Sequence, residues 1–286
     1  MAQINTWSDI SSIANAVQED AYFIVREAAT LQNLVKVFTD LSGGNLRKSY
    51  KYNSLTVKSI AEADDLTSDA FTPSADQTLT PAEIGGQFFI TDLRAQSEGP
   101  EMVLTDAARE LGFAAASKIN TDISGNFASL TGGTIGASGS AITWGYVAAA
   151  IARARNAAKS DSVPLACVIH AYQAAVLAKA ASIAGATISI DTVDSVTKGG
   201  LRQAFSFLGV PIYQVYVAPD SSTDYTGGVF QRDAIAIDWR RQIRVAAERD
   251  ESRRGVELNM SAVYAHGVWR PDLGIKMIFA ASAPSS

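Results

Sequence analysis

The longest amphipathic pattern in the chain runs from residue 101 to residue 130. Apolar side chains recur there at spacings of three and four residues, which is the repeat of one helix face. They are Leu104, Ala108, Leu111, Ala115, Ile119, Ile123, Phe127 and Leu130. Pro100 suits a first helical turn, and about thirty residues would make a helix of roughly 45 Å. The pattern predicts one long helix that crosses most of the subunit.

A stretch that cannot build a core of its own precedes this helix. Its ends, Lys48–Ile60 and Leu79–Ala95, have the composition of strands, whereas residues 61–77 between them are acidic and polar. A two-stranded arm is only marginally stable in water, and its edges can pair with another chain. We therefore predict that residues 46–100 form a protruding hairpin that neighbouring subunits complete.

Residues 1–42 show a helical repeat of apolar positions that extends to Leu31, Val35 and Phe38. The Gly43-Gly44 pair then interrupts the repeat. The sequence thus predicts a mostly helical N-terminal segment.

The second half of the chain alternates helical and extended patterns. Glycine-rich residues 131–141 indicate a flexible joint. Residues 142–220 predict a helix, a strand, a second helix, a short helix, a turn at Gly209 and a strand over Val210–Ala218. This alternation is typical of a compact α/β unit. From Gly228 onward the pattern is that of strands.

Composition narrows the class of protein. The 286 residues, 47% hydrophobic and 19% charged, are typical of a folded chain of one large domain or two smaller ones. A net charge of -5 and a pI near 5.1 argue against a dedicated nucleic-acid-binding protein. Cys167 is the single cysteine, which excludes an intramolecular disulfide and favours a reducing compartment. We expect neither a secretion signal in residues 1–20 nor a membrane span.

Charge is distributed unevenly along the chain. Residues 1–130 carry 9 basic against 17 acidic side chains, and residues 131–286 carry 15 against 12. This distribution permits head-to-tail attraction between two copies, and the alternative is a scatter of charges with no such role. We hypothesise an ion network between subunits, in which acids of the arm meet arginines of a neighbour. The acids are Glu62, Asp64, Asp65 and Asp69, and the arginines are Arg240, Arg241, Arg244, Arg253 and Arg254. The alternative is a solvated surface that contributes little to stability.

The chain shows no motif for catalysis, cofactor binding or metal binding. Cys167 and His170 lie three residues apart on a predicted strand, so their side chains point to opposite faces. For His266, at a strand end, a structural role is favoured. The sequence lacks a G-x-S-x-G elbow and phosphate-binding glycine fingerprints, and its histidines and cysteine do not complete a typical zinc site. We therefore predict no enzyme activity, no cofactor and no metal.

The order of elements resembles that of the major capsid protein of tailed bacteriophages, whose fold was first seen in phage Hong Kong 97. The best-matching segments are FLGVPIYQVYVAP (207–219), GGVFQRDAIAIDWRRQIRV (227–245) and GVWRPDLGIKMIFAA (267–281). The resemblance implies an α+β fold of five parts. These are an N-terminal arm (1–45), an extended loop (46–100), a peripheral domain (101–159) with a spine helix (101–130), an axial domain (160–225), and return strands of the peripheral domain (226–286).

The resemblance also implies a function. Copies would form pentamers and hexamers that close into an icosahedral shell around double-stranded phage DNA, which they would contact non-specifically. The protein would lie in the virion capsid after assembly in the host bacterial cytoplasm. Its partners would be a portal protein and, where they are used, scaffolding or decoration proteins.

Two features of some family members are not expected here. One is an N-terminal scaffolding segment that is later removed. The other is a Lys–Asn bond between subunits: Lys51, Lys58 and Asn259 lie in suitable segments, but no motif selects them, and we predict no cross-link.

Other functions stay open from the sequence. An encapsulin-type nanocompartment shell has the same fold around cargo enzymes and would differ in particle size and DNA content. An α/β enzyme with a site in residues 142–220 would be a monomer whose size does not depend on concentration. A tail-tube protein fits the long helix less well.

Overall fold

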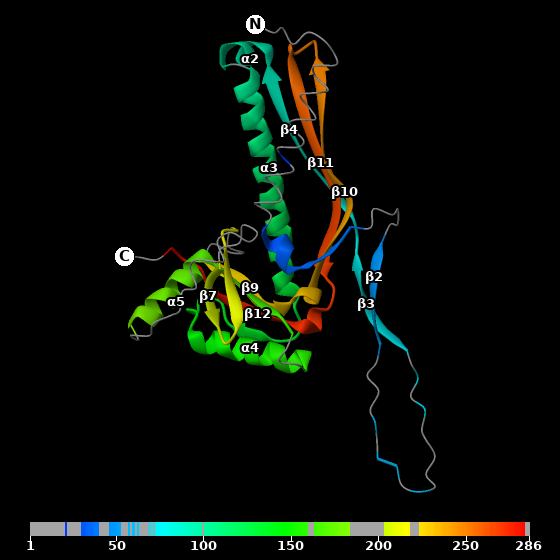
Figure 1. Ribbon diagram of the computed structural model, residues 1–286, viewed down its shortest axis with the longest axis vertical. Coiled ribbons are helices and arrows are strands. Elements are labelled where there is room, and N and C mark those ends of the chain that lie inside the picture. Colours follow the sequence, from blue (N-terminus) through cyan, green and yellow to red (C-terminus); the bar gives the residue numbers. More distant parts are fainter. Residues whose placement is uncertain are drawn as a thin grey trace.

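The computed structural model has an elongated body, a compact layer at one end, and a hairpin that projects from the same end (Figure 1). The structure describes residues 21, 30–39, 46–52, 57, 59–60, 62, 68, 70, 72–98, 100–159, 163–183, 203–217 and 223–283.

The elongated body packs one long helix on one long sheet. Helix α3 (Pro100–Gly125) continues as the 3₁₀ turn η2 (Asn126–Ser129). It lies along a four-stranded sheet of order β1-β10-β11-β4. These strands are β1 (Lys36–Phe38), β10 (Ile235–Asp250), β11 (Gly255–Val268) and β4 (Ala82–Thr91). The first pairing is parallel and the other two are antiparallel.

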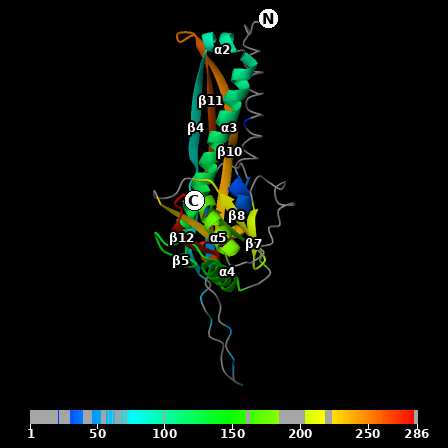
Figure 2. The same cartoon turned by 90° about the vertical axis from the view of Figure 1, so that its left-hand side faces the viewer.

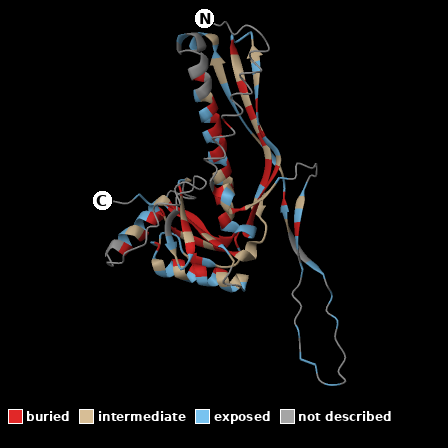
Figure 3. Cartoon of the chain, in the orientation of Figure 1, coloured by how far each residue is buried: buried red, intermediate tan, exposed pale blue. Residues whose placement is uncertain are grey.

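The predicted apolar stripe is the buried face of α3 and η2. All its members from Ala108 to Leu130 are at most 2% exposed, and they form a core with the inner face of β10 and β11 (Figure 3). The long helix is therefore confirmed. It ends at Gly125, and the last predicted turn is 3₁₀ rather than α.

The compact layer is a six-stranded sheet of order β5-β12-β9-β6-β8-β7. Its strands are β5 (Thr134–Gly136), β12 (Gly274–Ala280), β9 (Asp224–Gln231), β6 (Leu165–His170), β8 (Val210–Val215) and β7 (Gln203–Phe207). One face packs on helices α4 (Trp144–Ala158) and α5 (Ala171–Ile183). The other face meets Phe127 and Leu130 at the end of the long helix. The two sheets thus share the end of α3.

Short elements connect these layers. They are the 3₁₀ turns η1 (Thr30–Leu34), η3 (Arg232–Ala234) and η4 (Pro271–Leu273), and helix α2 (Asp92–Glu98), which links β4 to α3. Thr143 caps α4, because its hydroxyl accepts a hydrogen bond from the Tyr146 amide. Helices α4 and α5 confirm the first two helices that the pattern of residues 142–220 predicts.

The projecting hairpin is β2 (Arg47–Tyr52) paired with β3 (Pro73–Leu79). The sequence predicts Leu79–Ala95 as its second limb, but Ala82–Thr91 instead forms β4 of the long sheet. Ile84 and Ile90 pack there against the core of α3. Burial against that core therefore decides where this strand pairs.

Two further predictions gave the wrong type of element. Lys36–Phe38 is a strand, because it pairs with Ala236–Asp238 of β10, although Leu31 and Val35 are buried as the helical repeat required. The rest of residues 1–42 lies outside the described residues, apart from Ala21, η1 and Thr39. The short helix expected before Gly209 is strand β7, because it pairs with β8 across that turn.

The glycine-rich residues 131–141 are not a flexible joint. Thr134–Gly136 is β5, which pairs with β12. A Cβ added at Gly132 would lie 2.7 Å from the carbonyl oxygens of Asp272 and Gly274, so glycine is required there by close backbone packing.

Candidate subunit contact surfaces

The root of the hairpin is fixed to the body by one buried carboxylate. Asp238 on β10 has no exposed side-chain surface. Arg47, the first residue of β2, donates from Nε to its Oδ2 at 2.9 Å, and its guanidinium lies 4.3 Å from the centre of the Phe38 ring. Leu79, paired with Arg47 across the hairpin, packs in a small core with Ala236 and Ala265. The root is therefore rigid.

Beyond its root the hairpin exposes large apolar side chains. Tyr50 and Tyr52 on β2 are 57% and 48% exposed, and Val57 and Ile60 further along are also exposed. The hairpin extends away from the rest of the chain, and its described residues are mostly exposed in Figure 3. Exposed apolar groups on a projecting ribbon are typical of a surface that another molecule covers.

Of the four acids of the predicted network, the structure describes only Glu62. Glu62 is exposed. Asp64, Asp65 and Asp69 lie outside the described residues. Their contact with a neighbour stays a prediction.

Three of the predicted arginines have acidic partners within their own chain, and two of these three are Arg240 and Arg241. Arg240 is largely buried, and its Nη2 lies 2.8 Å from Asp238 Oδ2, so it shares this carboxylate with Arg47. Arg241 forms an ion pair with Glu83 on β4 and also donates to the Ser261 hydroxyl.

The other three arginines lie nearer the far end of the long sheet. Arg253 pairs with Glu257 at 3.2 Å and lies over the Phe89 ring. Arg254 is exposed in a left-handed turn with φ of 52°. Arg244 is exposed on β10, and within the described ranges no acidic side chain pairs with it. Neither Arg244 nor Arg254 forms an ion pair with the described residues, although the charge of Arg254 helps to lower the pKa of Asp92. Their contact with another subunit stays a prediction.

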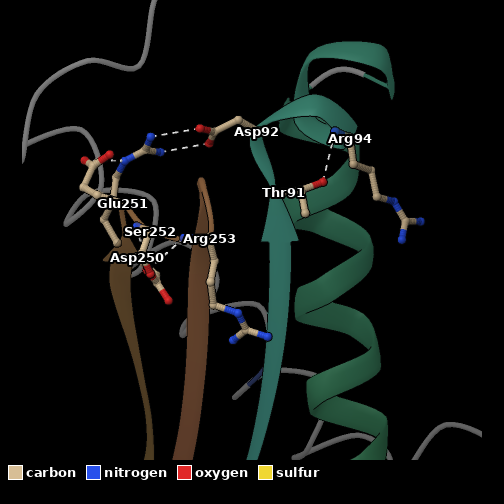
Figure 4. Close-up of polar contacts among 8 residues, drawn as sticks. Thr91, Asp92, Arg94, Asp250, Glu251, Ser252 and Arg253 are labelled. Carbon is tan, nitrogen blue, oxygen red and sulfur yellow. Dashed lines mark hydrogen bonds and ion pairs between the residues drawn. The ribbon is translucent and has the colours of Figure 1, made fainter.

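The far end of the long sheet is organised by two acids that sequence reasoning did not select (Figure 4). Arg249 makes two parallel hydrogen bonds of 2.9 Å to Asp92 at the start of α2, and a third to Glu251. This pairing lowers the pKa of Asp92 and raises that of Arg249. The Asp92 amide also donates to the Arg254 carbonyl at 3.0 Å, which joins α2 to the turn.

Asp250 closes the same turn. It accepts hydrogen bonds from the Ser252 hydroxyl and from the Ser252 and Arg253 amides. The hydroxyl bond is the main reason that the pKa of Asp250 is lowered. Arg249 and Asp250 lie among the predicted arginines between Arg240 and Arg254, but Asp92 is far away in sequence, so no local signal marks it as the partner of Arg249.

Cys167 and His170 do not form a catalytic pair. Cys167 is fully buried in the core beneath α4 and α5, and burial raises the pKa of its thiol to about 12. His170 contacts Tyr225 on the other face of the sheet, and burial lowers the pKa of its imidazole. This opposite placement follows the alternation of a strand, as predicted.

His266 lies in a polar cluster between β11 and α3. Its Nδ1 is 3.2 Å from the Asn126 amide, and its Nε2 is 3.8 Å from Asp122. Tyr264 donates to the same aspartate at 2.6 Å. Burial lowers the pKa of His266, and the charge of Asp122 opposes that shift. The cluster joins helix to sheet.

The described ranges contain neither a candidate metal centre nor a helix suited to a membrane. No three metal-ligating side chains gather there. No described helix combines the length and apolar character needed to cross a membrane.

Comparisons with known proteins identify the family and the fold of this chain. The model of a family described as phage capsid protein matches residues 75–277. The capsid of Ralstonia phage GP4 has a TM-score of 0.66 at 12% identity, covering 93% of this chain and 92% of that one. The head protein of Helicobacter pylori bacteriophage KHP40 reaches 0.62 at 12% identity, covering 86% and 88%. A virus-like particle from Pyrococcus furiosus reaches 0.59 at 11% identity, covering 92% and 98%.

No curated protein matches the sequence significantly. The structural matches confirm the predicted α+β, Hong Kong 97-like capsid fold.

Proposed function

The chain belongs to the phage capsid protein family, and we propose that its copies assemble as pentamers and hexamers into a closed icosahedral shell around double-stranded phage DNA. As a capsid protein of a bacteriophage it is a structural component of the virion shell, and family membership implies a role other than catalysis.

The hairpin is the observation that carries the finer proposal. Arg47 and Leu79 hold its root rigidly, whereas Tyr50, Tyr52 and Val57 beyond the root are exposed. A rigid root with an apolar, solvent-exposed arm suits a strap that lies over an adjacent subunit. Covering the exposed part of such side chains contributes on the order of 1 kcal/mol each, and the gain is repeated at every contact of a symmetric shell.

Fewer arginines remain as candidates for the proposed ionic contact between subunits. Arg240, Arg241 and Arg253 already pair within their own chain. We propose that Arg244 and Arg254 are the arginines that meet the acidic loop residues Glu62, Asp64, Asp65 and Asp69 of a neighbour.

The domain division remains part of the proposal. We keep an N-terminal arm, an extended loop, a peripheral domain built on α3 and an axial domain. The six-stranded sheet supports a larger axial domain than residues 160–225, because β5, α4 and β12 pack in the same layer. The contacts with a portal, with scaffolding or decoration proteins and, non-specifically, with packaged DNA are proposed from the family, as is assembly in the host cytoplasm.

Electron microscopy of the expressed protein tests the proposal. We expect closed icosahedral particles with pentamers at the five-fold vertices. Particles purified from infected cells should contain double-stranded DNA. DNA-free particles loaded with an enzyme would instead favour a nanocompartment, and a concentration-independent monomer in light scattering would contradict a shell.

A further inference from the structure

The two long edges of the four-stranded sheet differ in how they are protected. In β10, beyond the three residues that pair with β1, the pairing to β11 shifts register twice between Trp239 and Arg244. This stretch also carries a dense series of charges from Arg240 to Asp250. Bulges and charges are the usual devices that stop a strand edge from pairing with another chain.

The opposite edge, β4, has none of these devices. Its ten residues pair with β11 without a register shift, and Glu83 is its only charged residue. Pro81 precedes the strand, and no proline lies inside it. Figure 2 shows β4 at one margin of the sheet, and in the described part of the chain no strand pairs with its outer side.

The direction of the β4 backbone groups follows from one hydrogen bond. The Asp92 amide donates to the Arg254 carbonyl at 3.0 Å, one step beyond the pair Thr91–Gly255. Antiparallel pairs alternate between hydrogen-bonded and non-bonded positions, so the even-numbered residues of β4 bond to β11. The amides and carbonyls of Glu83, Gly85, Gln87 and Phe89 therefore point outward.

Side chains along β4 also indicate that another molecule covers this strand. Ile84 and Ile90 pack against the core, but Phe88 between them is 39% exposed. A Cβ added at Gly86 would meet nothing closer than 3.8 Å, and Gly86 is not in the left-handed region. The subunit itself thus has no need of glycine at this position. Glycine inside a strand often marks the close approach of another backbone.

We propose that the outer edge of β4 pairs with a strand from a second copy of this chain, so that the sheet continues across the subunit boundary. This proposal rests on the proposed shell, which places identical chains side by side. The hairpin β2–β3 is a suitable donor, because it projects from the body and both of its outer edges are unpaired in the described residues. Main-chain hydrogen bonds would supply the affinity, and Phe88 would be covered.

A proline at one outward position tests the pairing. Gln87→Pro removes an outward N–H and leaves the bonds to β11 intact, and edge strands tolerate such a proline. Gln87→Ala is the matched control, because both variants lose the side-chain bond to Glu257. Gln87→Pro should need about tenfold more protein to assemble than Gln87→Ala. At each contact the proline removes one backbone hydrogen bond and adds a steric clash, which together change the affinity on the order of tenfold.

Hydrogen exchange of backbone amides at single-residue resolution tests the edge pairing of β4 without a variant. In free subunits Gly86 and Phe88 should be protected, whereas Gly85, Gln87 and Phe89 should exchange quickly. In shells assembled from purified protein all five should be protected. Fast exchange at the three outward amides in intact shells would overturn the edge pairing alone. Failure of the wild-type protein to assemble at all would contradict both this pairing and the shell.

Discussion

Arg47 and Asp238, 191 residues apart in the chain, form the ion pair that fixes the hairpin to the body. Asp238 is fully buried on β10, and Arg240 approaches the same oxygen at 2.8 Å. One buried carboxylate therefore pairs with two guanidinium groups at the point where the projecting arm leaves the sheet.

Removal of this carboxylate should destabilise the free subunit strongly. Asp238→Ala removes the buried carboxylate with which Arg47 and Arg240 both pair, and breaking a buried ion pair in this way typically costs about 3–5 kcal/mol. Arg47→Ala should cost less, about 1–2 kcal/mol, because Arg240 still pairs with Asp238. Urea unfolding of the subunit measures both variants. Exposed Arg244→Ala is the control, and equal losses for Asp238→Ala and this control would contradict the shared-carboxylate account.

The pair Asp92–Arg249 should make stability depend on pH in the acid range. Its guanidinium lowers the pKa of Asp92 in the folded state, so the pair stabilises the subunit above about pH 4, the pKa of an unfolded aspartate. The contribution is lost as pH falls through the lower folded pKa. Because Asp92 is more than a third exposed, the pair should contribute less than about 1 kcal/mol.

Asp92→Asn should therefore be less stable than the wild type at pH 7, and the difference should close as pH falls below 4. Thermal unfolding at a series of pH values measures this. Asp106→Asn, an exposed position on α3, serves as the control. A difference that persists unchanged into strong acid would show that Asp92 acts through packing and not through its charge.

The single thiol should report unfolding. Cys167 is buried and its pKa is raised to about 12, so almost no thiolate exists at pH 8 and the native protein should not react with a disulfide reagent. In urea one thiol per chain should react. Fast labelling of the native protein would mean that the core beneath α4 and α5 opens readily.

Local patterns predicted the elements that bury one continuous face. The stripe from Ala108 to Leu130 was predicted correctly, because a helix repeats its contacts every three or four residues and the two sheets bury one continuous face of it. The strand at Lys36–Phe38 was missed, because its spacing also fits a helix and only the parallel pairing with β10 decides between them.

Local sequence patterns predicted the contact surfaces less completely than the elements. The arginines from Arg240 to Arg254 were recognised as a charged group, but some of their partners lie far away in sequence. Glu83 and Asp92 become partners of Arg241 and Arg249 only through the register of the long sheet, whereas Asp238 and Glu257 lie close in sequence to Arg240 and Arg253. A sequence pattern carries no signal for a pairing across more than a hundred residues.

This division sharpens the prediction for the ionic contact between subunits. Arg244 is exposed and unpaired within the described ranges, so Arg244→Glu should leave the free subunit folded, with an unchanged circular dichroism spectrum. If Arg244 meets the acidic loop of a neighbour, the reversal places like charges together and should raise the protein concentration needed for assembly. Added salt should also raise the protein concentration that the wild type needs for assembly, because salt screens exposed ion pairs.

The reciprocal reversal separates this contact from a general charge effect. Asp64→Arg with Asp65→Arg should impair assembly as Arg244→Glu does, and combining all three changes should restore it in part, because the charges are then exchanged and not removed. Light scattering against protein concentration measures each variant. An effect of either reversal without rescue in the combination would assign these residues to separate contacts. If no variant changes assembly, the strap is held by its apolar and backbone contacts, and the charged residues are solvated surface.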